Sequence, residues 1–216
     1  MFIGHYAPAF VAATRKEAPE LGAMFVGVQL LDYGFFTFLL TGTEHMRMVP
    51  GFTKMNPMDL YDLPYTHSLV GACVWAAGFA LLLRALKCSW AGAAIGAAMV
   101  LSHWLLDLVV HTHDLTIAGT PPKFGFGLWN YPAIEMPLEV GMVLVSAWFY
   151  RRRTTATGAK WALPALIILM LALQAVNWFG GEAKAVTPGT SYLGLFAFTL
   201  IAAVGWWVGR NRAVKG

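Results

Sequence analysis

Charged residues are scarce in this sequence. Only 12% of its 216 residues are Asp, Glu, Lys or Arg, whereas 58% are hydrophobic, and the mean hydropathy is +0.59. A soluble protein of this length needs more polar side chains to cover its surface. The composition therefore excludes an ordinary soluble globule and favours the lipid bilayer as solvent and partner.

Cysteine is scarce as well, and the two that occur are Cys73 and Cys88. They fall on one expected helix and its end, roughly 22 Å apart at helical rise, which excludes a disulfide between them. The basic residues form short clusters beside apolar runs instead of one stripe, which argues against nucleic-acid binding. The chain has neither internal repeats nor a composition boundary, so we predict a single integral membrane domain over residues 1–216.

Long apolar runs make up most of the sequence. Six of them approach or reach the length that a helix needs to cross about 30 Å of hydrocarbon. They are residues 21–41, 66–86, 89–110, 132–150, 161–180 and 191–209. The sequence therefore predicts an all-α, polytopic transmembrane bundle of about six spans.

The first 13 residues are apolar but too short to span. They precede Arg15 and Lys16, the reverse order of a secretory signal peptide, so we expect this segment to be retained. Either it lies along the membrane interface, or it enters the bilayer as a half-helix that turns back near residues 15–20. The second alternative carries His5 inward.

Basic residues are distributed unevenly between the two sides of these spans. The N-terminal loop, residues 84–90 and 151–160 and the tail after residue 209 together carry 11 of the 15 Lys and Arg residues. The remaining connections, 42–65, 111–131 and 181–190, carry Arg47, Lys54, Lys123 and Lys184. The positive-inside bias predicts that both termini are cytoplasmic and that the longer loops lie outside.

Several ionisable side chains fall inside the expected spans or at their ends. They are Asp32, His67, His103, Asp107, His111, Glu135 and Glu139. A charge in a span is costly unless it pairs, binds a ligand or faces water. His103, Asp107 and His111 are spaced by four residues, so they form one stripe on a helix.

Most of these groups are expected at similar depths in the membrane. Measured from the cytoplasmic helix ends at helical rise, Asp32 lies at about 18 Å, His103 at about 21 Å, Asp107 at about 27 Å and His67 at about 28 Å. Glu139 lies at about 16 Å, and His5 reaches about 15 Å on the half-helix alternative. We therefore expect a polar cluster toward the outer half of the membrane.

Imidazoles and carboxylates without thiolates suit zinc and, less specifically, iron or manganese. We predict His67, His103 and Asp107 as the inner ligands, with Asp32, Glu139 and His5 as further ligands or orienting partners. Glu139 or Asp32 would serve as the general base.

The polar residues of the spans and loops can also be explained by structural roles alone. The stripe on residues 103–111 is also what an interhelical hydrogen-bond cluster would produce. His111 lies one turn further out and is expected to reach the outer interface. Glu135 is close enough to the interface to extend toward water, Gln174 is expected to make packing hydrogen bonds, and His45 and His113 are expected to be solvated loop residues.

Five segments occur in the order FIGHYAPAF, QLLDYGFF, PYTHSL, LSHWLLDLVVH and FGLWN. In this arrangement the chain resembles a bacterial inner-membrane family of predicted membrane-bound metal-dependent hydrolases, over roughly residues 1–145. The resemblance implies metal roles for His5, Asp32, His67, His103 and Asp107, and a location in the bacterial inner membrane. The family usually carries a doubled acidic motif where this chain has Asp32 alone.

These observations favour a membrane-embedded, metal-dependent hydrolase, with zinc as the preferred divalent ion, acting on an ester or phosphoester of a lipid or membrane-delivered substrate. The main alternative is an ion- or proton-coupled transporter that uses the same buried His, Asp and Glu residues. A third is a histidine-rich di-metal oxidoreductase or a haem protein with His67 and His103 as axial ligands.

Overall fold

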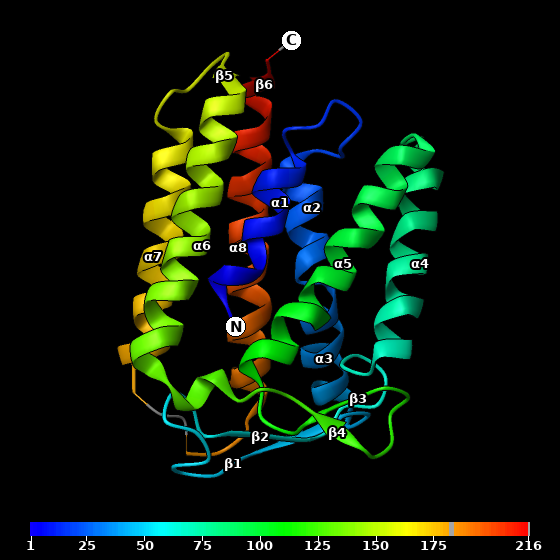
Figure 1. Cartoon of the computed structure of the whole chain (residues 1–216), viewed down its shortest axis with the longest axis vertical. Helices are drawn as coiled ribbons and strands as arrows, with labels where there is room; N and C mark the ends of the chain where they lie inside the picture. The colour runs from blue at the N-terminus through cyan, green and yellow to red at the C-terminus, as the bar shows by residue number, and fades with distance from the viewer. Residues whose placement is uncertain (182–183, 216) are drawn as a thin grey trace.

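A computed structural model describes residues 1–181 and 184–215 of the chain. In these residues eight α-helices lie along a common direction, with the connections gathered at two ends (Figure 1). The helices are α1 (Ala7–Ala12), α2 (Leu21–Val28), α3 (Leu30–Thr41), α4 (Leu69–Ala85), α5 (Trp90–Val110), α6 (Pro132–Arg153), α7 (Ala162–Phe179) and α8 (Pro188–Arg210). Two 3₁₀ helices, η1 (Ile3–Tyr6) and η2 (Leu128–Asn130), precede α1 and α6.

Short antiparallel strand pairs close both ends of this bundle. The pairs β1 (His45–Met48) with β2 (Met58–Asp62) and β3 (Leu115–Thr116) with β4 (Lys123–Phe124) lie at one end. The pair β5 (Thr154–Ala156) with β6 (Arg212–Val214) lies at the other (Figure 1). The site described below is covered from the side of β1 to β4.

Within the described residues, four helices are long and apolar enough to cross a membrane: α5, α6, α7 and α8. The bent pair of α2 and α3 would make a fifth. Large apolar side chains on the outer helix faces stay exposed, among them Val74, Leu81 and Ile168, each about two-thirds exposed. Such faces belong against lipid, so the chain is a helical membrane protein.

By length and composition, the described helices provide fewer than the six expected spans. The run predicted at 66–86 forms α4, an apolar helix of 17 residues, which is shorter than the others. The run predicted at 21–41 is broken at Gln29, where α2 and α3 meet at 53°. The sequence has no proline at this position, and the length of the apolar run alone predicted one span.

Helix starts follow local sequence chemistry. The side chains of Ser68 and Ser89 cap α4 and α5 by accepting hydrogen bonds from the backbone N–H groups of Gly71 and Gly92, each at 3.0 Å. Proline occupies the first turn of α6 and α8, where its missing N–H costs nothing. Capping therefore places His67 directly before the first turn of α4.

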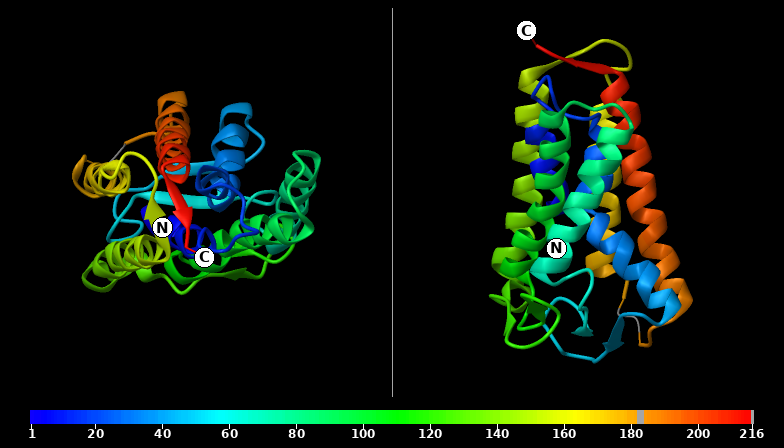
Figure 2. Two further views of the ribbon diagram at one scale, coloured as in Figure 1. Left: turned by 90° about the horizontal axis from the view of Figure 1, so that it is seen from above. Right: turned by 90° about the vertical axis from the view of Figure 1, so that its right-hand side faces the viewer.

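The N-terminal segment adopts the second of the two arrangements considered from the sequence, a half-helix inside the bundle. η1 begins midway along the bundle, and α1 runs from there toward the end that carries β5 and β6 (Figure 2). Ile3, Tyr6 and Phe10 are fully buried and belong to the same apolar core as Phe25 and Leu166. The segment is thus an internal part of the bundle, and it delivers His5 to its interior.

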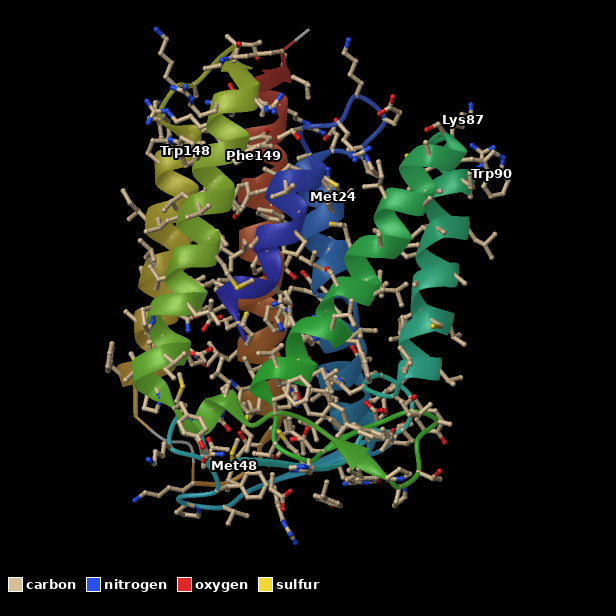
Figure 3. The ribbon with its side chains drawn as sticks, viewed as in Figure 1. Met24, Met48, Lys87, Trp90, Trp148 and Phe149 are labelled. Atoms are coloured by element: carbon tan, nitrogen blue, oxygen red, sulfur yellow. The ribbon has the colours of Figure 1, made fainter. Side chains whose placement is uncertain are left out.

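Aromatic and basic side chains meet at the β5–β6 end. Lys87, Trp90 and Trp148 lie there, whereas Met48 lies at the opposite end (Figure 3). The guanidinium of Arg84 stacks 4.5 Å from the centroid of the Trp90 ring, and that of Arg152 lies 5.9 Å from Trp148. Tryptophan beside arginine is typical of a membrane–water interface.

Candidate metal centre

Six ionisable side chains converge in the interior of the bundle from separate elements. They are His5 from η1, Asp32 from α3, His67 before α4, His103 and Asp107 from α5, and His111 directly after α5. All are at least 95% buried except Asp32, whose side chain is 19% exposed. The five residues predicted as metal ligands are therefore brought together by the fold.

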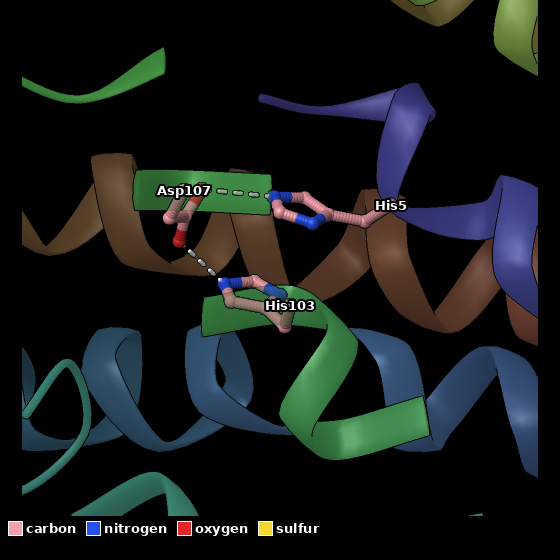
Figure 4. A group of neighbouring side chains, drawn as sticks. All are labelled: His5, His103 and Asp107. Carbon is pink, nitrogen blue, oxygen red and sulfur yellow. Dashed lines mark ion pairs between the residues drawn. The ribbon is translucent and has the colours of Figure 1, made fainter. Parts of the chain in front are cut away.

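Asp107 lies at the centre of this cluster. Its Oδ1 lies 3.1 Å from His5 Nε2 and 3.3 Å from His111 Nε2. Its Oδ2 lies 2.9 Å from His103 Nε2 and 3.5 Å from His67 Nε2. Figure 4 shows the contacts with His5 and His103. Each oxygen of one carboxylate thus faces two imidazole nitrogens.

Asp32 adds a second carboxylate beside two of these histidines. Its Oδ1 lies 3.5 Å from His67 Nε2 and 3.6 Å from His103 Nε2. The partial exposure of Asp32 marks the side on which the cluster is least enclosed. The break between α2 and α3 places this residue in the first turn of α3.

His103 is held by the same helix break. Its Nδ1 lies 2.6 Å from the carbonyl oxygen of Val28, the last residue of α2. A carbonyl only accepts, so Nδ1 carries a hydrogen and donates it. The Nε2 lone pair of neutral His103 is then directed at the carboxylates, where only a cation or a further proton makes the contact favourable.

The Nδ1 atoms of His111 and His67 follow a similar pattern. His111 Nδ1 lies 2.9 Å from Asp114 Oδ1, and His67 Nδ1 lies 2.8 Å from Thr66 Oγ1. Histidines that bind metals ordinarily have their second ring nitrogen held in this way, because the contact fixes the tautomer and the ring orientation. Val28, Thr66 and Asp114 therefore support the ring orientations of the cluster.

Several buried polar atoms at the centre lack an aligned hydrogen bond to any described residue. These atoms are Nδ1 and Nε2 of His5, Nε2 of His103 and Oδ2 of Asp107. Leaving such groups unpaired in an apolar interior costs free energy, more so for charged ones. A bound cation would satisfy Nε2 of both histidines and the Asp107 oxygen at once.

The distances also suit a metal ion. Within each of two triads, His5–His103–Asp107 and Asp32–His67–His103, one donor atom from every residue lies within 4.8 Å of the others. Ligands about 2.1 Å from a tetrahedral zinc lie roughly 3.4 Å apart. The contacts between Asp32, His67, His103 and Asp107, at 2.9–3.6 Å, are close to that separation. Donor type and spacing are therefore those of a group that could hold a metal ion.

Glu139 does not join the cluster. Its Oε1 accepts hydrogen bonds from the backbone N–H groups of Phe2 at 2.5 Å and Gly4 at 3.0 Å, and its Oε2 accepts one from Gln174 at 2.9 Å. Glu139 therefore holds the η1 segment that carries His5. Its role as general base stays a prediction.

Two features of the site differ from what the sequence indicates. His111, expected at the outer interface, is only 4% exposed. The segment after α5 folds over it and brings the Trp129 ring to 4.2 Å from the His111 ring, measured between centroids. Glu135 is fully buried instead of reaching water. His45 and His113 are exposed as expected.

Helix spacing finds the stripe containing His111, but the burial of that residue depends on a long-range loop contact. The contact between the Val28 carbonyl and His103 depends on the break between α2 and α3, which the sequence did not predict. Comparison of the chain with family models, curated proteins and solved structures gives no match. The resemblance described above therefore rests on its motifs alone.

Proposed function

We propose that this protein is a membrane-embedded hydrolase that uses a divalent metal ion, zinc by preference, to cleave an ester or phosphoester of a lipid or membrane-delivered substrate. The observation that carries the proposal is the buried cluster of imidazoles and carboxylates around Asp107, whose central atoms lack aligned hydrogen bonds. Imidazole and carboxylate donors without thiolates suit zinc and, less specifically, iron or manganese.

In this proposal His67, His103 and Asp107 hold the metal, and His5 and His111 contact the remaining oxygen of Asp107. Bound zinc supplies Lewis acidity and makes a coordinated water acidic near neutral pH. Asp32, the most accessible group of the cluster, is placed to accept a proton from water at the open side. Its carboxylate is also within reach of the same metal, so Asp32 has either role.

The substrate class follows from the position of the cluster. It lies among helices whose outer faces are apolar and is covered by the β1–β4 loops, so a soluble polymer has little access. A substrate with a polar, hydrolysable head and a membrane-soluble part reaches Asp32 most directly.

Membrane topology completes the proposal. Counting α4 with α5 to α8 and the bent pair α2–α3 as one span gives six crossings. The basic connections that follow α1, α4, α6 and α8 gather at the β5–β6 end, which we assign to the cytoplasm. The cluster then lies toward the periplasmic half of a bacterial inner membrane.

The test combines metal analysis with activity. Wild-type protein purified in mild detergent without chelators is expected to contain about one to two equivalents of zinc, the range typical of hydrolytic metal centres. It should hydrolyse chromogenic esters, phosphodiesters or lipids, lose activity with a chelator and regain it with zinc. The His103→Ala variant should lose both metal and activity.

The exposed pair His45 and Asp62, 2.8 Å apart on the β1–β2 hairpin, offers a matched control. His45→Ala should leave metal content and activity unchanged. Wild-type protein that contains no metal after this purification would refute the metal-dependent hydrolase.

A transporter is the second candidate, favoured by one observation. The break between α2 and α3 lies at the cluster, and discontinuous helices often line ion sites in transporters. Proteoliposomes that exchange zinc or protons across the membrane, without turnover of any ester, would favour this alternative over hydrolysis.

A further inference from the structure

Glu44 is a fully buried carboxylate outside the cluster that the proposed function does not use. It follows α3 and immediately precedes β1, at the end of the bundle where the loops cover the site. Nothing in the sequence distinguished it from the other loop acids. A buried charge is retained only where it has strong partners, so its contacts indicate its role.

Within the described residues, all hydrogen bonds of the Glu44 side chain go to the segment that carries His67. Oε1 of Glu44 accepts from the backbone N–H groups of Tyr65 at 2.8 Å and Thr66 at 2.9 Å. Oε2 accepts from the hydroxyl of Thr66 at 2.6 Å. Thr66 is itself fully buried and also touches the His67 ring. The carboxylate therefore fixes both the backbone and the side chain directly before His67.

Proton counting then determines the state of His67. A hydroxyl has one hydrogen to donate, and an ionised carboxylate can only accept. Thr66 donates its hydrogen to Glu44, so its oxygen must accept the hydrogen of His67 Nδ1 across 2.8 Å. Neutral His67 then has its lone pair on Nε2, the atom that lies 3.5 Å from both Asp32 and Asp107.

We propose that Glu44 and Thr66 are positioning residues for the metal centre, which hold His67 in the tautomer whose Nε2 is free to bind the metal. This inference rests on the metal-binding part of the proposed function and adds to it the residues that prepare one ligand. Contacts of this kind typically change metal affinity by about 10- to 100-fold.

Glu44→Gln is the decisive substitution, because the two backbone N–H donors require an acceptor at the Oε1 position. They keep the amide oxygen there and turn the NH₂ group toward Thr66. The hydroxyl must then accept from the amide and donate to His67 Nδ1, which moves the imidazole hydrogen to Nε2. The volume is unchanged, but the ligand atom is blocked.

The first measurement is zinc affinity of the full-length protein in detergent, stripped of metal and titrated with zinc against a chromophoric chelator. Glu44→Gln and Thr66→Val are expected to bind zinc about 10- to 100-fold more weakly. Thr66→Ser keeps the hydroxyl and should bind like wild type. Asp59→Asn, which alters an acid on β2 paired with Arg47 instead, should also bind like wild type.

The second measurement reads the tautomer without metal. In ¹⁵N-histidine-labelled, metal-free protein, the His67 signal is identified by its loss in His67→Ala. At a pH where this ring is neutral, wild type should show the hydrogen on Nδ1 and Glu44→Gln should show it on Nε2. A purely structural role for Glu44 would not move this signature.

The inference is overturned if neutral His67 of wild type carries its hydrogen on Nε2, or if Glu44→Gln and Thr66→Val bind zinc with wild-type affinity. Failure of the proposed function looks different, because wild type itself would then bind no zinc. The tautomer measurement would still decide the role of Glu44 and Thr66 in that case.

Discussion

At the scale of single residues, the chemistry of the candidate site depends on how each imidazole is held. Val28 accepts from His103 Nδ1, and Asp114 lies at hydrogen-bond distance from His111 Nδ1. In each ring the other nitrogen is left for Asp107. Because the rings of His67, His103 and His111 each have a partner on Nδ1, their Nε2 atoms converge without a loss of rotamer freedom at the moment of binding.

The residues of α5 should separate ligands from supporting groups. His103→Ala and Asp107→Asn are expected to remove bound metal, while the helices still insert because the surrounding Leu and Val residues are unchanged. Of the contacts to Asp107, His111→Ala removes one to Oδ1, and it should weaken metal binding by about tenfold. Metal content and melting temperature are measured side by side.

His113→Ala serves as the control, since this exposed histidine lies two residues from His111 and outside the cluster. If the cluster only joins helices, each substitution inside it would instead lower stability by roughly 0.6 kcal/mol, and metal content would be the same in all variants and in wild type.

At the scale of elements, the N-terminal segment depends on α6 and α7 for its position. Glu139 on α6 accepts hydrogen bonds from backbone N–H groups on both sides of Ile3, and the N–H of Ile3 lies 3.4 Å from the side-chain oxygen of Gln174 on α7. The segment is too short to be a stable helix alone. Its capture by these two side chains is what brings His5 to Asp107.

Glu139→Ala tests this capture against a catalytic role. If Glu139 positions η1, the variant should bind zinc more weakly, by about tenfold, because His5 loses its anchor. If Glu139 is instead the general base, the variant should retain its metal, and its kcat should fall by about 10²-fold or more. Glu20→Ala, at an exposed loop position, is the control and should resemble wild type.

Close packing of α2 on α8 gives a second element-level prediction. A Cβ on Gly22 would lie 2.4 Å from the Trp206 ring and 2.7 Å from its backbone nitrogen, whereas Gly78 on α4 has open space. Gly22→Ala should therefore destabilise the protein by about 1–3 kcal/mol through overpacking. Gly78→Ala should stabilise it by about 0.5–1 kcal/mol, because alanine loses less entropy in a helix.

Thermal unfolding in one detergent would compare the two variants. Equal shifts of melting temperature in the same direction would contradict the tight contact between α2 and α8.

At the scale of the whole molecule, the charge distribution predicts the orientation in the membrane. A reporter fused after Gly216 should behave as cytoplasmic, and one inserted near Gly51, in the β1–β2 loop, should behave as periplasmic. The reversed pattern would overturn the assignment of the cluster to the outer half.

Much of the site followed from spacing and depth, because ionisable residues are rare in apolar helices and their positions are therefore informative. His67, His103 and Asp107 could be located in this way. Glu44, Val28 and Asp114 could not, since their roles arise from a loop fold and a helix break that depend on contacts distant in sequence. The same reason explains why residues 21–41 were expected as one straight span.

The capture of η1 by Glu139 and Gln174 also has a consequence for biogenesis. During synthesis the segment that carries His5 is made first, yet its anchors emerge more than a hundred residues later. At about 5–20 residues per second, this segment waits roughly 8–35 s for Gln174. In the proposed metal centre, the contact between His5 and Asp107 would therefore form only after membrane insertion of α7, and a ribosome stalled before that helix would hold an inserted chain without a complete centre.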